Sequence, residues 1–146
     1  MTGFYAGKDQ AMPTKKPTPL IPVSWGELID KITILEIKRA RLRGEAVLAN
    51  VGRELEALSA IAAPALAKDE TARHLMARLK VLNEILWDIE IGVRAKEATN
   101  SFDAEFVELA RAIYKRNDER AALKRQLSLQ LGSELIEEKN YTSGVD

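Results

Sequence analysis

Residues 23–42, VSWGELIDKITILEIKRARL, contain both the start of a helix and its apolar seam. Ser24 can cap the helix by accepting a hydrogen bond from the backbone N–H of Glu27, whose side chain can reach back to the cap. Val23 can pack on Leu28 as a hydrophobic staple. The seam recurs at steps of three and four and consists of Trp25, Leu28, Ile32, Leu35, Arg39 and Leu42. This spacing predicts a helix that ends near Gly44, with Arg39 as the one charged residue of its seam.

Two further helices follow from the same spacing. The second has an apolar face made of Leu48, Val51, Leu55 and Leu58. Because proline disfavours helical backbone at the residue before it, Ala63-Pro64 is expected to stop this helix and keep it short. Asp69 and Glu70 place negative charge at the start of a long third helix, where it interacts favourably with the helix dipole. Asn100 and Ser101 are expected to close that helix.

The fourth predicted helix runs from about Phe102 to Leu131, with Gly132 as its C-terminal stop. No stretch alternates apolar and polar residues as a half-buried strand would. The predicted fold is therefore all-α, an antiparallel bundle of about four helices whose long third and fourth helices form a coiled-coil-like hairpin. The expected organisation is a flexible, proline-rich arm over residues 1–22, a bundle domain over residues 23–132, and a tail over residues 133–146 that could pack back on the bundle.

Composition narrows the classes of function. Lys and Arg number 22, as do Asp and Glu, so the formal net charge is zero and nothing draws the whole chain toward nucleic acid or acidic lipid. The chain has no cysteine, which excludes disulfides, thiolate metal sites and a cysteine nucleophile. No apolar run approaches the roughly 18 residues that cross a bilayer, and no signal peptide is recognisable. We therefore expect a cytoplasmic protein that does not enter a membrane.

Several segments are similar to a known bacterial helical family, the domain of unknown function 6165. They are PVSWGELIDKITILEIK at residues 22–38, LWDIE at 86–90, residues 102–127, and GSELIEEKNY at 132–141. Some members of that family are associated, by fusion or gene neighbourhood, with tetratricopeptide-repeat proteins and surface-polysaccharide glycosyltransferases. The resemblance thus implies a helper role in surface-polysaccharide biosynthesis, and it implies no catalytic residue.

Few residues are suited to catalysis or metal binding. His74 is the only histidine, and it lacks the glutamate three residues earlier that a di-metal carboxylate bundle requires. Glu84 and Asp88 share a helix face beside Trp87, which could raise the pKa of one carboxyl group for acid catalysis. The simpler interpretation is that both are solvated or paired with Lys or Arg. No catalytic residue, metal or cofactor is assigned, and an enzyme is the minority hypothesis.

The seam of the fourth helix turns polar after Ile113, at Asn117, Arg120 and Lys124, and Arg116 joins the same stripe. A buried arginine without a partner costs about 3–5 kcal/mol, so an anion must meet Arg120. The acids expected to do so are Asp88, Glu84 and Glu36.

Three hypotheses compete for this polar stretch. The first is an internal layer, including Arg39, that sets the register of the helices. The second is a cleft that binds an anionic small molecule such as a sugar phosphate. The third is a nucleic-acid surface, because residues 111–125 contain six basic and two acidic side chains; the acidic tail residues Glu134, Glu137 and Glu138 could neutralise it.

The function favoured by these patterns is protein–protein interaction or assembly, with a second copy or another protein as partner. The candidate interface consists of Ile34, Ile37, Trp87 and Ile91, which lie away from the main seams. The candidate ligand-binding residues, which line the predicted groove between the first and fourth helices, are Trp25, Lys31, Asp88, Asn117, Arg120 and Lys124. Nucleic acid is an unlikely partner on this pattern.

Overall fold

The computed structural model describes residues 14–141, and within them the chain forms four α-helices and no strand. They are α1, Trp25–Arg41; α2, Glu45–Ala67; α3, Glu70–Ala98; and α4, Ala104–Gln130. The all-α fold predicted from the sequence is confirmed. The predicted start and end of the first, third and fourth helices are correct to within about three residues.

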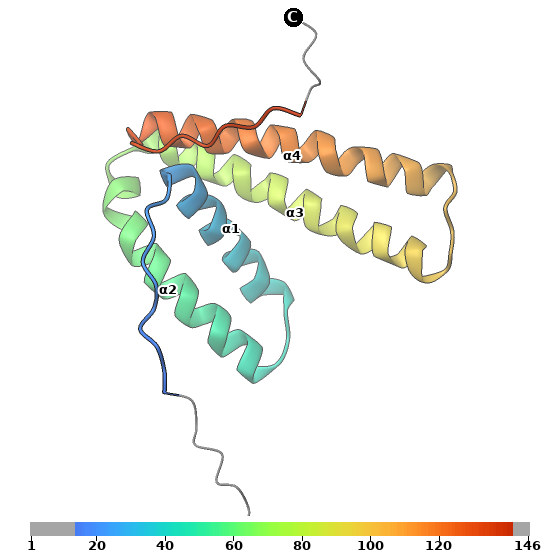
Figure 1. Cartoon of the computed structure of the whole chain (residues 1–146), viewed down its shortest axis with the longest axis horizontal. Helices are drawn as coiled ribbons and strands as arrows, with labels where there is room; N and C mark the ends of the chain where they lie inside the picture. The colour runs from blue at the N-terminus through green and yellow to red at the C-terminus, as the bar shows by residue number, and fades with distance from the viewer. Residues whose placement is uncertain (1–13, 142–146) are drawn as a thin grey trace, which may run out of the picture.

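The helices pair as two antiparallel hairpins (Figure 1). One is α1 with α2, and the other is the long pair α3 with α4, as expected. Helix α1 lies between them and contacts the other three helices, whereas α2 contacts α1 and α3 but not α4. The α1–α2 hairpin runs obliquely to the longer one, whose far end extends beyond it (Figure 1). One end of the α3–α4 hairpin is therefore covered by α1 and α2, and the other end projects (Figure 1).

Capping residues set the helix starts. Ser24 accepts a hydrogen bond from the backbone N–H of Glu27 at 3.1 Å, as predicted. The side chain of Glu27 does not return to the cap, because it bonds Lys124 of α4 instead. Asp69 and Asp103 cap α3 and α4 through the backbone N–H groups of the residues three positions later. These bonds satisfy amides that a helix start leaves without a partner.

The second helix is longer than predicted. Gly44, with φ of 103°, is the N-cap of α2 rather than the end of α1. Pro64 does not stop α2, which continues to Ala67. Pro64 and Ala60 are both exposed, so water can bond the Ala60 carbonyl that the proline leaves without a donor. The extra turn brings Leu66 against the core.

The core has two parts that meet at α1. One, between α1, α3 and α4, contains Ile29, Ala72, Leu75, Leu79, Leu82, Leu123 and Leu127. The other, mainly between α1 and α2, contains Leu28, Ile32, Leu35, Val51, Leu55 and Ala62. Arg39, which the predicted seam placed among these residues, is exposed, because the buried face of α1 turns away from it near the end of the helix.

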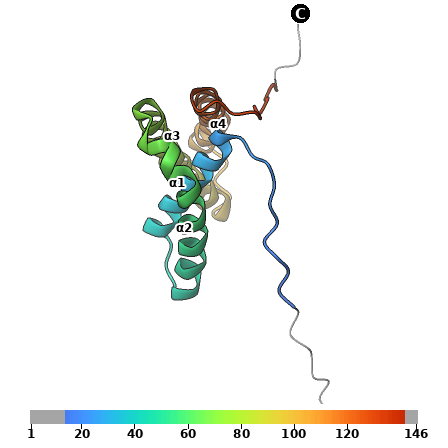
Figure 2. The ribbon, with the colours of Figure 1, turned by 90° about the vertical axis from the view of Figure 1, so that its left-hand side faces the viewer.

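The segments that flank the helices differ from each other. Residues 14–22 have no secondary structure, are exposed, and lead away from the helices (Figure 2). After α4, Gly132 takes a positive φ of 67° and the following residues return along α4 (Figure 1). Residues 1–13 of the expected arm and 142–146 of the expected tail lie outside the described residues.

Candidate functional site at the crossing of α1 and α4

A buried carboxylate holds α1 and α4 together. Asp30 of α1 is 1% exposed and accepts two hydrogen bonds from Arg120 of α4, from Nε to Oδ1 at 3.0 Å and from Nη2 to Oδ2 at 2.5 Å. The arginine is 28% exposed. Such a two-point contact between a guanidinium and a carboxylate is strong and directional. The hydrogen bonds to Asp30 outweigh the effect of burial and raise the pKa of Arg120, so the guanidinium stays charged.

Helix α3 completes the network. Asn83 donates from Nδ2 to Asp30 Oδ1 and to Thr33 Oγ1, both at 2.9 Å. Thr33 in turn donates to the backbone carbonyl of Asp30 at 2.8 Å. Within residues 14–141, no buried side-chain nitrogen or oxygen lacks a partner. The network therefore joins three helices with its polar atoms satisfied, as a stable internal polar layer requires.

The first turn of α1 is fixed by serines of the chain's other end. The backbone N–H of Gly26 donates to Ser128 Oγ, and that of Trp25 donates to Ser133 Oγ, each at 3.0 Å. A Cβ atom on Gly26 would lie 2.1 Å from the carbonyl oxygen of Lys124. Position 26 therefore requires glycine, because the backbones of α1 and α4 meet there.

Lys124 lies beside this network, mostly buried. Its Nζ is 2.6 Å from Glu27 Oε2 and 3.0 Å from Glu137 Oε2. Burial lowers the pKa of Lys124, but the hydrogen bonds to Glu27 and Glu137 outweigh it, so the net shift is upward. A groove of about 200 Å³ opens here between α4 and the tail, lined in part by Asn117, Arg120 and Lys124.

The predicted ligand-binding residues separate into two groups. Asn117, Arg120 and Lys124 do line one groove. Lys31 is directed to Glu54 of α2, at 3.4 Å, and exposed Asp88 accepts a hydrogen bond from Arg41 at 2.5 Å. Trp25 lines a different, largely apolar cavity of about 400 Å³ with Leu28, Ile61 and Leu135. The structure therefore does not bring the six predicted residues into one site.

The partners of Arg120 were predicted incorrectly. None of the three acids proposed from the sequence meets it: Asp88 pairs with Arg41, Glu36 pairs with Lys80 at 3.1 Å, and Glu84 lies elsewhere on α3. The sequence did not single out Asp30, Thr33 and Asn83, because these polar residues lie away from the main apolar seams of their helices. A second buried stripe of α1, at steps of four, three and four, contains the signal and consists of Gly26, Asp30, Thr33 and Ile37.

The candidate interface residues also differ in their surroundings. Ile37 is buried inside the chain, so no partner can reach it without unfolding α1. Ile34 and Trp87 are partly buried, and Arg41 lies over the Trp87 ring, 6.0 Å from its centre. Ile91 is exposed on the projecting part of α3. Of the four, Ile91 is the residue that a partner could contact most freely.

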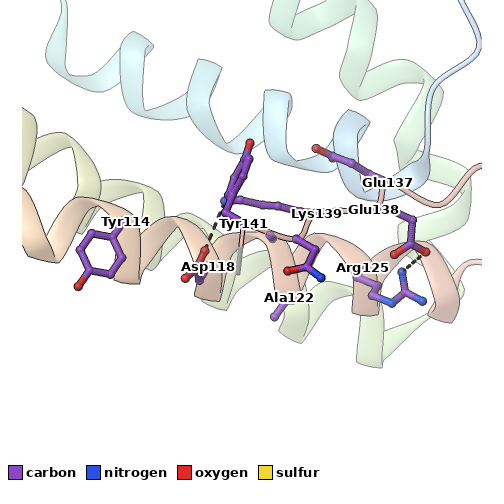
Figure 3. A pocket seen from close by; sticks show the side chains of 10 residues that line it. Tyr114, Asp118, Ala122, Arg125, Glu137, Glu138, Lys139 and Tyr141 are labelled. Carbon is purple, nitrogen blue, oxygen red and sulfur yellow. Dashed lines mark hydrogen bonds and ion pairs between the residues drawn. The ribbon is translucent and has the colours of Figure 1, made fainter. Parts of the chain in front are cut away.

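The tail forms a second, larger hollow against α4. It has a volume of about 640 Å³ and lies between α4 residues that include Tyr114, Asp118 and Arg125 and the tail residues 137–141. Figure 3 shows Lys139 directed to Asp118 and Glu138 directed to Arg125. The hollow is lined by acidic, basic and aromatic side chains. This lining favours a partner with charged and aromatic groups over a purely apolar one.

Two further classes of site are not found in the part of the chain that the structure describes. His74 is exposed, and no three His, Cys, Asp or Glu side chains among residues 14–141 are grouped so that they could hold a metal ion. None of the helices described there is both long enough and apolar enough to pass through a membrane.

Comparison with known proteins places the chain without assigning it an activity. No curated protein and no solved structure matches it. One family model matches residues 20–146, which include all four helices and the tail. The chain therefore belongs to a family of unknown function, DUF6165.

Proposed function

We propose that this protein is a helical interaction module, and that it assembles with a second copy or another protein through the projecting part of the α3–α4 hairpin. This part, residues 89–112, is named the outer hairpin. It lies beyond α1 and α2 (Figure 1). Three large apolar side chains are exposed on it, Ile91, Phe102 and Val107. The observation that carries the proposal is that these side chains project from a helical hairpin that the rest of the described chain does not cover.

The outer hairpin keeps its shape through its own contacts. A Cβ atom on Gly92 would lie 3.3 Å from Leu109 Cδ1, so the glycine lets α3 and α4 approach closely. The hydrogen bonds of Lys96 to Glu105 and Asp103 close the loop and raise the pKa of the lysine. An ordered surface loses little conformational freedom on binding, which favours association.

The polar cluster supports a structural role better than it supports binding of an anionic small molecule. Arg120 already bonds a buried carboxylate at two points, and Lys124 already has two acidic neighbours. An anionic ligand would have to compete with all of them. For an enzyme, Asp88 or Glu84 is the predicted acid or base, and Asp88 is exposed and bonded to Arg41. The interaction module therefore remains the preferred function, with the cytoplasm as its proposed location and polysaccharide biosynthesis as the context that the family resemblance implies.

The test is light scattering coupled to size exclusion at two protein concentrations, on wild type and on Val107→Asp. A matched control is Val81→Asp, since Val81 is 56% exposed and Val107 is 50% exposed, but Val81 lies outside the outer hairpin. We expect a concentration-dependent dimer that Val107→Asp weakens and Val81→Asp retains. If wild type is a monomer, the same three proteins are compared for a cross-linked partner in cell extract. Loss of assembly in both variants, or in neither, would contradict the proposal.

A further inference from the structure

Ion pairs join the tail to α4. Glu137 is 3.0 Å from Lys124, Glu138 is 2.8 Å from Arg125, and Lys139 is 3.5 Å from Asp118. The tail runs antiparallel to α4 (Figure 3). Two acids followed by a base therefore meet two bases followed by an acid. The face of α4 is therefore complementary in charge to an extended segment with this order of side chains.

The part of the tail after Glu137 holds this face only weakly. Glu138 is 79% exposed and Arg125 is 46% exposed, and ion pairs between exposed side chains contribute little in water. The hollow of about 640 Å³ remains between the tail and the helix, so the two surfaces are not closely packed. A segment that makes the same charge contacts and also fills this hollow would offset the loss of the tail's own contacts, which include Glu137 with mostly buried Lys124.

The face extends beyond the α4 residues that form ion pairs with residues 137–139. Its residues on α4 are Tyr114, Asp118, Ala121, Ala122 and Arg125, which we name the tail groove. They lie at helical spacings of three and four and so share one side of α4. Tyr114 is at the end nearest the outer hairpin and its ring is largely exposed. A longer or more apolar segment would therefore find further surface there.

We propose that the tail groove binds an extended acidic segment of a partner protein, and that residues 133–141 occupy it as an internal competitor. The occupant has two consecutive acidic residues, one for Arg125 and one for Lys124 beside the groove, then a basic residue for Asp118, and an apolar or aromatic side chain toward Tyr114. This inference rests on the proposed role as an interaction module and assigns it a second binding surface. The tail sets the affinity, because a partner must first displace it.

The test measures binding of a fluorescent peptide, SELIEEKNY, identical to residues 133–141, by anisotropy. The proteins are the full chain and the full-length variant Glu137→Lys/Glu138→Lys, whose own tail now repels Lys124 and Arg125. We expect the variant to bind the peptide at least about tenfold more tightly than wild type, and added salt to weaken that binding as it screens exposed charges. Circular dichroism confirms that each variant is folded.

A third charge change distinguishes binding in the tail groove from non-specific electrostatic attraction of the peptide to α4. Arg125→Glu, added to the tail variant, should abolish peptide binding. Lys115→Glu reverses a charge on the same helix but outside the groove, and it should change the peptide affinity by less than about twofold. Equal losses from the two changes, or no gain of binding in the tail variant, would overturn the proposal.

Size exclusion of the same tail variant tests whether the occupant is a partner protein or the tail of a second copy. A wild-type dimer that the tail variant no longer forms would also overturn the proposal, since the groove would then hold the tail of a second copy. Val107→Asp lies outside the tail groove, so failure of the outer hairpin to assemble leaves the peptide result intact.

Discussion

Two pairs join an arginine of α4 to a carboxylate of another segment, one on the inner side of the helix and one on its outer side. Asp30 with Arg120 and Glu138 with Arg125 have closest approaches of 2.5 and 2.8 Å, so they are alike in contact distance. They differ in surroundings, because Asp30 is 1% exposed and Glu138 is 79% exposed. The inner pair also bonds Asn83 of α3, whereas the outer pair joins α4 to the tail.

The comparison shows that burial, not the pair itself, decides what an ion pair does. Removing one partner of a buried pair leaves a charge without solvent or counter-charge, while an exposed pair is replaced by water. The inner pair therefore fixes how α1 crosses α4, and the outer pair can open. The crossing of α1 and α4 should contribute most to stability, whereas the tail should open and close more readily.

The largest effect is expected from Asp30→Ala. It leaves Arg120 and Asn83 without their shared acceptor, and the free energy of unfolding should fall by about 3–5 kcal/mol in urea denaturation. Asp30→Asn keeps the shape and one acceptor, so it should cost less. A loss below about 1 kcal/mol for Asp30→Ala would show that the crossing does not depend on this network.

The next largest effect concerns the backbone contact at the same crossing. Gly26→Ala places a Cβ atom 2.1 Å from the Lys124 carbonyl oxygen, so the helices must separate. We expect the free energy of unfolding to fall by about 1–3 kcal/mol. Gly52→Ala is the matched control, because Gly52 lies inside α2 with no atom within 4 Å of the new methyl group. That change should raise stability by about 0.5–1 kcal/mol. Equal effects of the two changes would contradict the close contact.

A smaller effect is expected from acid, at the carboxylates that cap helices. The backbone N–H of Ala72 and the side chain of Gln130 lower the pKa of Asp69 below 3.8. The backbone N–H of Phe106 and then Lys96 lower the pKa of Asp103 in the same way. Because each pKa is lower in the folded chain, the stabilisation is fully present above about pH 4 and is lost as the pH falls through the folded value.

The measurement for this third prediction is thermal unfolding at about pH 6 and about pH 3. The double variant Asp69→Asn/Asp103→Asn keeps capping side chains that do not titrate. It should lose less melting temperature between the two pH values than wild type, by a few degrees. Equal losses would mean that other carboxylates account for the acid sensitivity.

The smallest effect belongs to the outer pair. Glu138→Gln should change the free energy of unfolding by less than about 1 kcal/mol, because both side chains are exposed. In the same variant, limited proteolysis should cleave the tail faster than in wild type. If Glu138→Gln destabilises the chain as much as Asp30→Ala, the distinction between the two sides of α4 fails.

Much of the fold was predictable because local patterns dictate it. Ser24 and the apolar seam after it predicted α1, and Asp69 marked the start of α3, since capping and helical periodicity depend only on neighbours in sequence. The end of α2 was predicted wrongly at Pro64, because whether a proline ends a helix depends on the exposure of the surrounding turn.

The site was predictable only in part. The polar stretch at Asn117, Arg120 and Lys124 was visible as a break in an apolar seam, and its need for an anion followed from the cost of a buried charge. The identity of that anion did not follow. Asp30 is 90 residues from Arg120 in sequence, and only the oblique crossing of α1 over α4 brings the two together.

Spacing within single segments was enough to predict four helices, the Ser24 cap of the first, and the demand for a counter-charge on α4. The tertiary structure alone decided that Asp30 meets this demand, that Gly26 lies against Lys124, and that the tail covers part of α4. Crossing geometry depends on how side chains of different helices interlock, and no single helix carries that information.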